Sequence, residues 1–214
     1  MPWRGARARG GARAYARAAL PSRRLPWRQG RYCVLDLELS GLDPRRHEII
    51  AVGAVPVDDG RVRLDGAISS LVAPTGPLAE ESIRVHGIRR ADLDDAPALE
   101  VVIDALLDAM AGRVLVAHYA RIERAFLAPQ LRRARVRLRG PVIDTAELVP
   151  LWLVERDGAP PKDLSLSGLA RAASPSRARA SVPIVWWARA SRCEAAAMKS
   201  WAVVRASPIA VCGE

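Results

Sequence analysis

The chain has 214 residues, half of them hydrophobic, and a formal net charge of +10 at pH 7. A chain of this length and composition buries one core, so we expect a single globular domain with tails. No apolar run approaches the roughly 18 residues that cross a bilayer, so we expect no membrane partner. The charge excess lies at the ends, because residues 1–31 hold nine Arg and no acid whereas residues 32–173 sum to −3.

The cysteines and the N-terminal extension indicate the setting of the protein. Cys33, Cys193 and Cys212 have no zinc-ligand spacing, and their odd number argues against a disulfide scaffold, so we expect a cytoplasmic protein. Residues 1–30 are rich in Arg, as transit peptides are, but a basic extension encoded by a GC-rich genome explains them more simply. Residues 1–19 lack apolar periodicity, which predicts disorder or a loosely held helix.

The first half of the domain reads as strands. Two apolar runs, at residues 34–39 and 49–57, are separated by a turn that contains Gly41 and Pro44. A hairpin turn at residues 58–60 leads into residues 61–72, which alternate as a third strand. These segments predict a β-meander.

The second half alternates between helix and strand. Apolar residues spaced three and four apart predict a helix over residues 97–110. Further along, the pattern predicts a strand at 114–117, a helix at 120–134, a strand at 141–145 followed by a helix to 153, and a last helix that starts within 164–173. This order predicts an α/β domain over residues 31–173, with a mixed central sheet flanked by helices and with irregular N- and C-terminal tails.

Residues 174–214 differ in character from the rest of the chain. They contain no Asp and no His, yet they hold three of the six Trp and two of the three Cys. Neither a helical nor a strand period persists through them. We interpret this ending as aberrant, and a shift of reading frame near codon 173 would explain all of these features.

Two acids interrupt the first predicted strand. Asp36 and Glu38 are two residues apart and therefore face the same side of a strand. Burying an uncompensated carboxylate costs several kcal/mol, and a divalent metal ion is a strong compensating charge that prefers oxygen ligands. The alternative is an edge strand whose acids are solvated.

The sequence around these acids resembles a known family. LDLELSGLDPRRHEIIAVGAV, residues 35–55, resembles the first motif of the DEDD-type 3′–5′ exonucleases, the family of the proofreading subunit of bacterial replicative DNA polymerase. Leu39 and Ser40 stand where the family has two Thr. SIRVHGI, residues 82–88, resembles the next landmark. Within it the resemblance places His86 at the wall of the site, whereas alone it would read as a surface or capping histidine.

A second motif follows in LVAHYARIERAFL, residues 115–127. The resemblance places Tyr119 at the family's usual Asn and Glu123 at a metal-ligand Asp, one methylene longer. The alternative makes Glu123 half of a surface ion pair with Arg121 or Arg124. For Asp144, in VIDT, we prefer a helix-capping role over catalysis.

The third motif of the family is missing. It normally supplies a His that acts as general base and, about five residues later, a metal-ligand Asp. LSLSGLA, residues 164–170, resembles the lead-in to that motif, but no His follows His118 and no Asp follows Asp163. Arg189 and Glu194 stand roughly where the pair would fall, and Arg cannot serve as a general base.

The resemblance implies a ribonuclease H-like fold and a two-metal site for Mg²⁺ or Mn²⁺. Asp36, Glu38 and Glu123 are the implied catalytic metal ligands. The implied substrate is nucleic acid with a free 3′ end, and a DNA polymerase is the implied partner. The residues expected to contact substrate are Leu39, Ser40, His86, His118 and Tyr119.

Other interpretations remain open at the level of the sequence. Because the third motif is absent, we expect impaired activity, and the alternative function is an inactive module that binds nucleic acid or a partner. An unstable product is a further alternative. The arginines within LRRARVRLRG, residues 131–140, form either a strip that tracks phosphates or a solvated helix end and loop.

Overall fold

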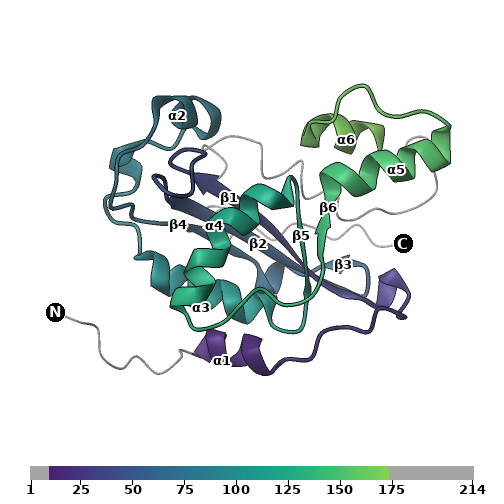
Figure 1. Ribbon diagram of the computed structural model, residues 1–214, viewed down its shortest axis with the longest axis horizontal. Coiled ribbons are helices and arrows are strands. Elements are labelled where there is room, and N and C mark those ends of the chain that lie inside the picture. The colour runs from purple at the N-terminus through teal and green to yellow at the C-terminus, as the bar shows by residue number, and fades with distance from the viewer. Residues whose placement is uncertain (1–9, 174–214) are drawn as a thin grey trace.

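The computed structural model describes residues 10–173, which fold around one mixed six-stranded sheet (Figure 1). The strand order is β3-β2-β1-β5-β6, and β4 also pairs with β2. Strand β1 runs antiparallel to β2 and parallel to β5, and β5 runs parallel to β6. The predicted mixed sheet flanked by helices is confirmed. The prediction that residues 174–214 form an aberrant tail lies outside the described residues.

The long β1–β2 hairpin forms the centre of the sheet. Strands β1 (Arg31–Leu39) and β2 (Ile49–Asp58) pair along their whole length. Alternate residues of β1, from Cys33 to Leu39, enter the main core, and the side chains between them face the other side of the sheet. Because strand residues alternate in this way, Asp36 and Glu38 share the face that begins with Tyr32.

The predicted third strand is two short strands. β3 (Arg61–Val62) and β4 (Ile68–Leu71) are separated by a 3₁₀ turn, η2 (Leu64–Gly66). The interruption falls opposite Pro56 of β2. The Pro56 carbonyl accepts a hydrogen bond from the Arg63 amide. The carbonyl and the nitrogen of a strand residue point to the same neighbouring strand, and the Pro56 nitrogen has no hydrogen to donate. The hydrogen-bonded pairing therefore stops there.

The elements predicted over residues 97–134 match the structure closely, the helix predicted to end at 153 extends to Asp157, and α2, η1 and η3 were not predicted. Apolar stripes spaced three and four residues apart bury one side of α3 and of α4 against the sheet. None of the helices within residues 10–173 is both long enough and apolar enough to cross a membrane. The bounds are η1 (Trp27–Gln29), α2 (Glu80–His86), η3 (Arg90–Asp92), α3 (Leu99–Met110), β5 (Val114–Ala117), α4 (Ala120–Arg133), β6 (Val142–Asp144), α5 (Thr145–Asp157) and α6 (Leu166–Ala172).

The main core lies between the sheet and three helices. Helices α3 and α4 cover one face of the sheet, and α1 packs on α3 from outside (Figure 1). Leu106, Leu107, Leu127 and Leu131 are fully buried there. Each such burial stabilises the fold by about 2 kcal/mol. Helices α5 and α6 form a separate small cluster around Leu153.

Within the N-terminal extension, for which the sequence predicts disorder or a loosely held helix, residues 10–17 form the packed helix α1 (Gly10–Arg17). Tyr15 is 2% exposed and belongs to the main core. Its hydroxyl accepts a 2.8 Å hydrogen bond from the Arg139 amide, and the Arg139 guanidinium donates to the carbonyls of Tyr15, Ala16 and Ala18 at 2.9 Å. Sequence periodicity could not reveal this helix, because its partner lies 124 residues away.

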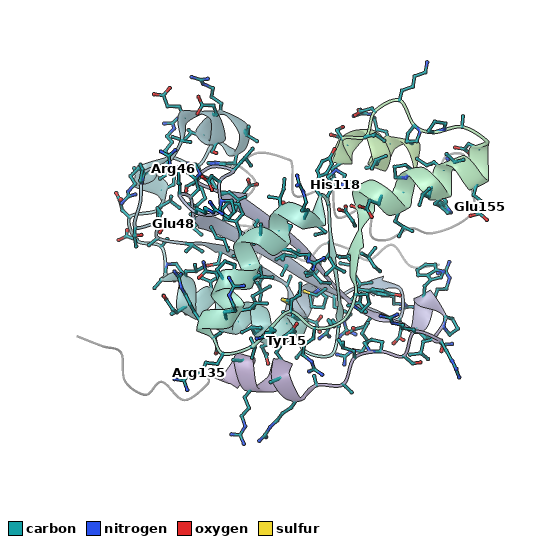
Figure 2. All side chains as sticks on the ribbon, in the orientation of Figure 1. Tyr15, Arg46, Glu48, His118, Arg135 and Glu155 are labelled. Atoms are coloured by element: carbon teal, nitrogen blue, oxygen red, sulfur yellow. The ribbon has the colours of Figure 1, made fainter. Side chains whose placement is uncertain are left out.

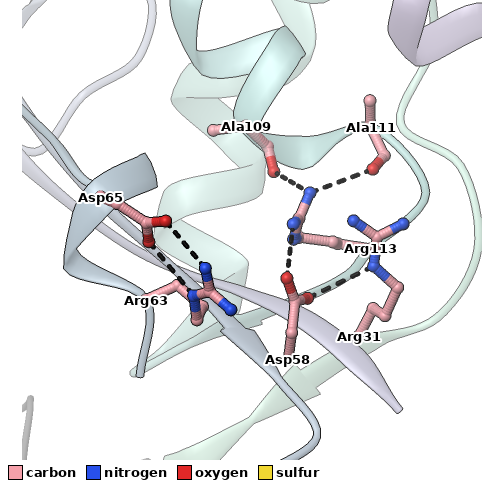
Figure 3. Close-up of polar contacts among 7 residues, drawn as sticks. All are labelled: Arg31, Asp58, Arg63, Asp65, Ala109, Ala111 and Arg113. Carbon is pink, nitrogen blue, oxygen red and sulfur yellow. Dashed lines mark hydrogen bonds and ion pairs between the residues drawn. The ribbon is translucent and has the colours of Figure 1, made fainter. Parts of the chain in front are cut away.

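A half-buried arginine, Arg113, joins the end of α3 to the central hairpin (Figure 3). Arg113 donates to the carboxylate of Asp58 at 2.9 Å and to the carbonyls of Ala109 and Ala111. Arg31 donates to the second oxygen of Asp58. Burial alone would raise the pKa of Asp58, but the hydrogen bonds and charges of the two arginines outweigh it and lower that pKa. This cluster fixes the start of β1 against β2 and β5.

Candidate active site

Asp36 and Glu38 lie on the central strand β1, half-buried and on one face. Their cross-strand partners are Gly53 and Ala51, whose small size leaves room beside both carboxylates. The pairing shifts by one residue directly after Glu38, a bulge that re-aims the end of the strand. Because β1 lies between β2 and β5, the alternative of an edge strand is wrong.

Glu123 meets these two acids from the first turn of α4. Its side chain is buried, with the residue only 5% exposed, and its Oε2 atom has no hydrogen-bond partner among residues 10–173. Burial raises the pKa of Glu123 to about 9, and the charges of Asp36 and Glu38 add to the rise, while a hydrogen bond with the backbone of Leu37 opposes it. The three acids are therefore close enough for their charges to interact.

The alternative role for Glu123, a surface ion pair, is wrong. Arg121 and Arg124 are exposed, whereas Glu123 faces inward. In the described part of the chain, neither arginine forms an ion pair with it. A buried carboxyl oxygen without a hydrogen-bond partner, here in the first turn of α4, is unfavourable for stability alone, which points to a functional role.

The acids do not form a finished metal cage. Among residues 10–173, no group of three or more His, Cys, Asp and Glu side chains is arranged closely enough to hold a metal ion. The chemistry of the donors nevertheless fits a hard divalent cation, because all three are carboxyls and one has a buried oxygen without a partner. Binding would require these side chains to move closer together.

His118 and Tyr119 lie between the end of β5 and the start of α4, shortly before Glu123 in the chain. Tyr119 has φ 56° and ψ 49°, the left-handed conformation that Asn tolerates better than an aromatic residue. Its ring is 47% exposed and lies edge-on to His118, with 4.4 Å between ring centroids. An exposed aromatic ring at this position offers a stacking surface for a base.

Asp144 and Thr145 hold this corner in place. The Asp144 carboxylate accepts from the amides of Tyr119 and Ala120 at 3.0 and 2.8 Å, and from Ala146 at 2.9 Å. Asp144 therefore caps two helices, and its predicted capping role is confirmed. Thr145, which the sequence did not single out, is buried with its Oγ1 atom 3.0 Å from His118 Nδ1. The D-T pair after a short strand was the available signal.

The other predicted substrate contacts lie at the end of β1. Leu39 packs into the main core, and Ser40 is 1% exposed, with its hydroxyl accepting from the Glu48 amide at 2.9 Å. His86 ends α2, and its Nδ1 atom accepts from the Ile88 amide at 3.0 Å. Burial lowers the pKa of His86, against a hydrogen bond with the Leu39 backbone that raises it. These residues shape the bend after Glu38, and their contact with a nucleotide stays a prediction.

Comparison with known proteins identifies the class. The profile of the exonuclease family matches residues 33–170, well over half of the chain. This protein therefore belongs to the exonuclease family. The matched range includes Asp36, Glu38 and Glu123, so the acids described above lie within the family's domain.

The relatives in sequence include several proteins named as DNA polymerase III. The chain is 31% identical over 120 residues to a PolC-type DNA polymerase III from Caldanaerobacter subterraneus, covering 56% of this chain and 8% of that protein. It is 34% identical over 118 residues to a DNA polymerase III subunit epsilon-like protein from Rhodobacter capsulatus, covering 55% and 17%. The chain thus spans only a small part of the curated relatives that it matches.

Solved structures confirm the ribonuclease H-like fold. A product-bound exonuclease I superposes with a TM-score of 0.61 at 11% identity, covering 82% of this chain and 46% of that chain. The unliganded exonuclease I gives a TM-score of 0.58 at 12% identity, covering 67% and 37%. At these identities the likeness concerns the fold alone.

Proposed function

We propose that this protein is a 3′–5′ exonuclease domain that hydrolyses phosphodiester bonds from the 3′ end of nucleic acid, with DNA as the substrate to test first. The convergence of Asp36, Glu38 and buried Glu123 at the junction of β1 and α4 carries this proposal. Membership in the exonuclease family, and relatives named as DNA polymerase III proteins, support it. A DNA polymerase is accordingly the proposed partner, and the cytoplasm the proposed compartment.

The proposed cofactor is Mg²⁺ or Mn²⁺, held by Asp36, Glu38 and Glu123. When bound, such ions activate water and stabilise the leaving oxygen of a phosphodiester. The chain's own contribution is to bring half-buried Asp36 and Glu38 and buried Glu123 together where β1 meets α4. The exposed Tyr119 lies at the N-cap of the same helix. His118, oriented by Thr145, borders the same corner.

We expect this activity to be impaired. Glu123 is one methylene longer than the Asp that the family uses, and displacements of about an ångström at a reacting centre can cost roughly 100-fold in rate. The sequence also offers no His after His118 to act as general base, and loss of such a base typically forfeits about 10²–10⁴ in rate. A binding module without cleavage is therefore the second candidate, supported by the absence of a finished metal cage within residues 10–173.

The test uses DNA labelled at its 5′ end, incubated with the full chain and Mg²⁺ or Mn²⁺. Slow, stepwise shortening from the 3′ end is expected, and Asp36→Asn should abolish it. The exposed Asp59→Asn is the matched control, which should leave the rate unchanged. Binding without any cleavage in either metal would select the inactive module, and rapid cleavage would contradict the expected impairment.

A further inference from the structure

The outer face of α4 carries an unusual distribution of charge. Its only acid is Glu123, which is buried, whereas Arg121, Arg124, Arg132 and Arg133 are exposed. Arg121, Arg124 and Arg132 fall within about 80° of one another at 3.6 residues per turn, and this arc borders the buried stripe of the helix. None of these four arginines forms an ion pair with another residue in the range 10–173.

Helix stability does not explain these arginines. A helix N-terminus carries partial positive charge and favours acids, so Arg121 and Arg124 in the opening turns work against the helix. Only Arg132 and Arg133, in the last turn, complement the dipole. The first two positions therefore require another reason, and a bound anion is the direct one.

The basic face begins at the candidate active site and leads away from it. Arg121 and Arg124 flank Glu123 in sequence, and Arg132 lies about 16 Å further along the helix axis. The loop after α4 continues the row with exposed Arg135 and Arg137. Figure 2 shows Arg135 and Tyr15 at the end of the molecule remote from His118, so the row runs along the molecule rather than encircling the site.

The structure also decides between the two interpretations of the loop after α4. Val136 and Leu138 point inward and pack against the main core, which fixes Arg135 and Arg137 on the outside. Arg139 is anchored on the carbonyls at the end of α1. The segment is therefore fixed to the core by its apolar residues while its basic residues alternate on the outside, and it is not a freely solvated loop end.

We infer that this row, Arg121, Arg124, Arg132, Arg135 and Arg137, is a track for the phosphate backbone of the nucleic acid whose 3′ end lies at the three acids. This inference rests on the proposed function and adds where the rest of the substrate lies. With one phosphate per about 3.4 Å of axis on each strand of a duplex, the helical part of the track spans roughly five phosphates. The track reads no bases, because phosphate contacts carry no sequence information.

The test compares two double variants of the full chain that remove the same charge. Arg124→Gln with Arg132→Gln removes two track residues, and Arg61→Gln with Arg63→Gln removes two exposed arginines near β3. All four positions are exposed, and unchanged thermal unfolding of both variants establishes that they fold. Binding of a fluorescein-labelled DNA oligonucleotide is followed by anisotropy in EDTA, where cleavage cannot occur, over a series of salt concentrations.

Each lost phosphate contact lowers the slope of log K against log salt by about 0.7–0.9, so the track variant should lose about 1.4–1.8 and bind several-fold more weakly. The β3 variant should match the wild type. An unchanged slope in the track variant, an equal loss in the β3 variant, or no binding of DNA by the wild type would each overturn the inference. Binding along the track without cleavage by the wild type in Mn²⁺ would uphold the track while refuting the proposed exonuclease.

Discussion

At the scale of single residues, the buried carboxyl of Glu123 links the candidate active site to the stability of the fold. Its carboxyl is buried among other acids, so the folded chain keeps it protonated up to about pH 9, whereas its ordinary pKa is 4.5. Unfolding therefore releases a proton between these two pH values. The free energy of unfolding must fall as pH rises through that window, by up to about 1.4 kcal/mol per pH unit from this group.

Glu123→Gln should remove this dependence, because an amide has the shape of the protonated acid and no proton to lose. Without metal, the variant should match the wild type at pH 4, below the ordinary pKa. At pH 8, about 3.5 units above that pKa, it should be more stable by up to about 5 kcal/mol, or on the order of 10 °C in Tm. Thermal unfolding by circular dichroism at both pH values measures this difference. Glu155→Gln, exposed on α5, is the control and should change neither Tm (Figure 2).

The site residues show what a single sequence can reveal about function. Asp36 and Glu38 were predictable because carboxylates are conspicuous inside an apolar strand. Glu123 was predictable only through the resemblance, since Glu on an arginine-rich helix reads equally well as a surface residue. Thr145 was not predictable, because its role depends on the fold bringing it to His118, 27 residues earlier in the chain.

At the scale of elements, α1 depends on a close approach that only glycine allows. A Cβ added to Gly11 would lie 1.8 Å from the Asp104 carbonyl oxygen of α3, whereas one added to Gly10 meets nothing within 4 Å. The Ala12 amide also donates to the Asp104 carboxylate at 3.3 Å. The packing of α1 on α3 thus depends on the absence of a side chain at Gly11 and on the contacts of Tyr15 and Arg139.

Gly11→Ala should therefore push α1 off α3 and lower the free energy of unfolding by about 2–3 kcal/mol, as overpacking does. Gly10→Ala is the matched control, and it should be neutral or stabilise by up to about 1 kcal/mol through its better helix propensity. Urea unfolding of both variants checks this. Equal stability of the two variants would show that α1 does not depend on contact with α3.

Other elements were predictable to different degrees. The apolar stripes of α3 and α4 gave their bounds almost to the residue, because their partners bury one clean face. The split between β3 and β4 was missed, because it depends on Pro56 in the neighbouring strand. For α1 the sequence predicts either disorder or a loosely held helix, because its few apolar residues show no period of their own and are buried only against α3.

At the scale of the whole molecule, metal binding should stabilise the domain. A ligand that binds only the folded state raises stability by about 2.7 kcal/mol at a concentration of 100 times its Kd. We expect Mn²⁺ to raise the Tm of the wild type by several degrees at pH 8. Asp36→Asn should lose most of this rise, and Asp59→Asn should keep it. A wild-type Tm that does not change when Mn²⁺ is added would argue against the proposed metal site.

The contacts between Arg139 and α1 also order the events of folding. Residues 10–18 leave the ribosome before the rest of the described chain, yet the guanidinium that holds their carbonyls is made more than 120 residues later. The hairpin of β1 and β2 closes locally, whereas α1 must wait for both α3 and the loop after α4. During synthesis Tyr15 is an apolar side chain without its pocket, and a chaperone or the emerging sheet has to shield it. Helix α1 is thus synthesised before α3 and α4, yet its anchoring contacts are available only once both of them and Arg139 have been made.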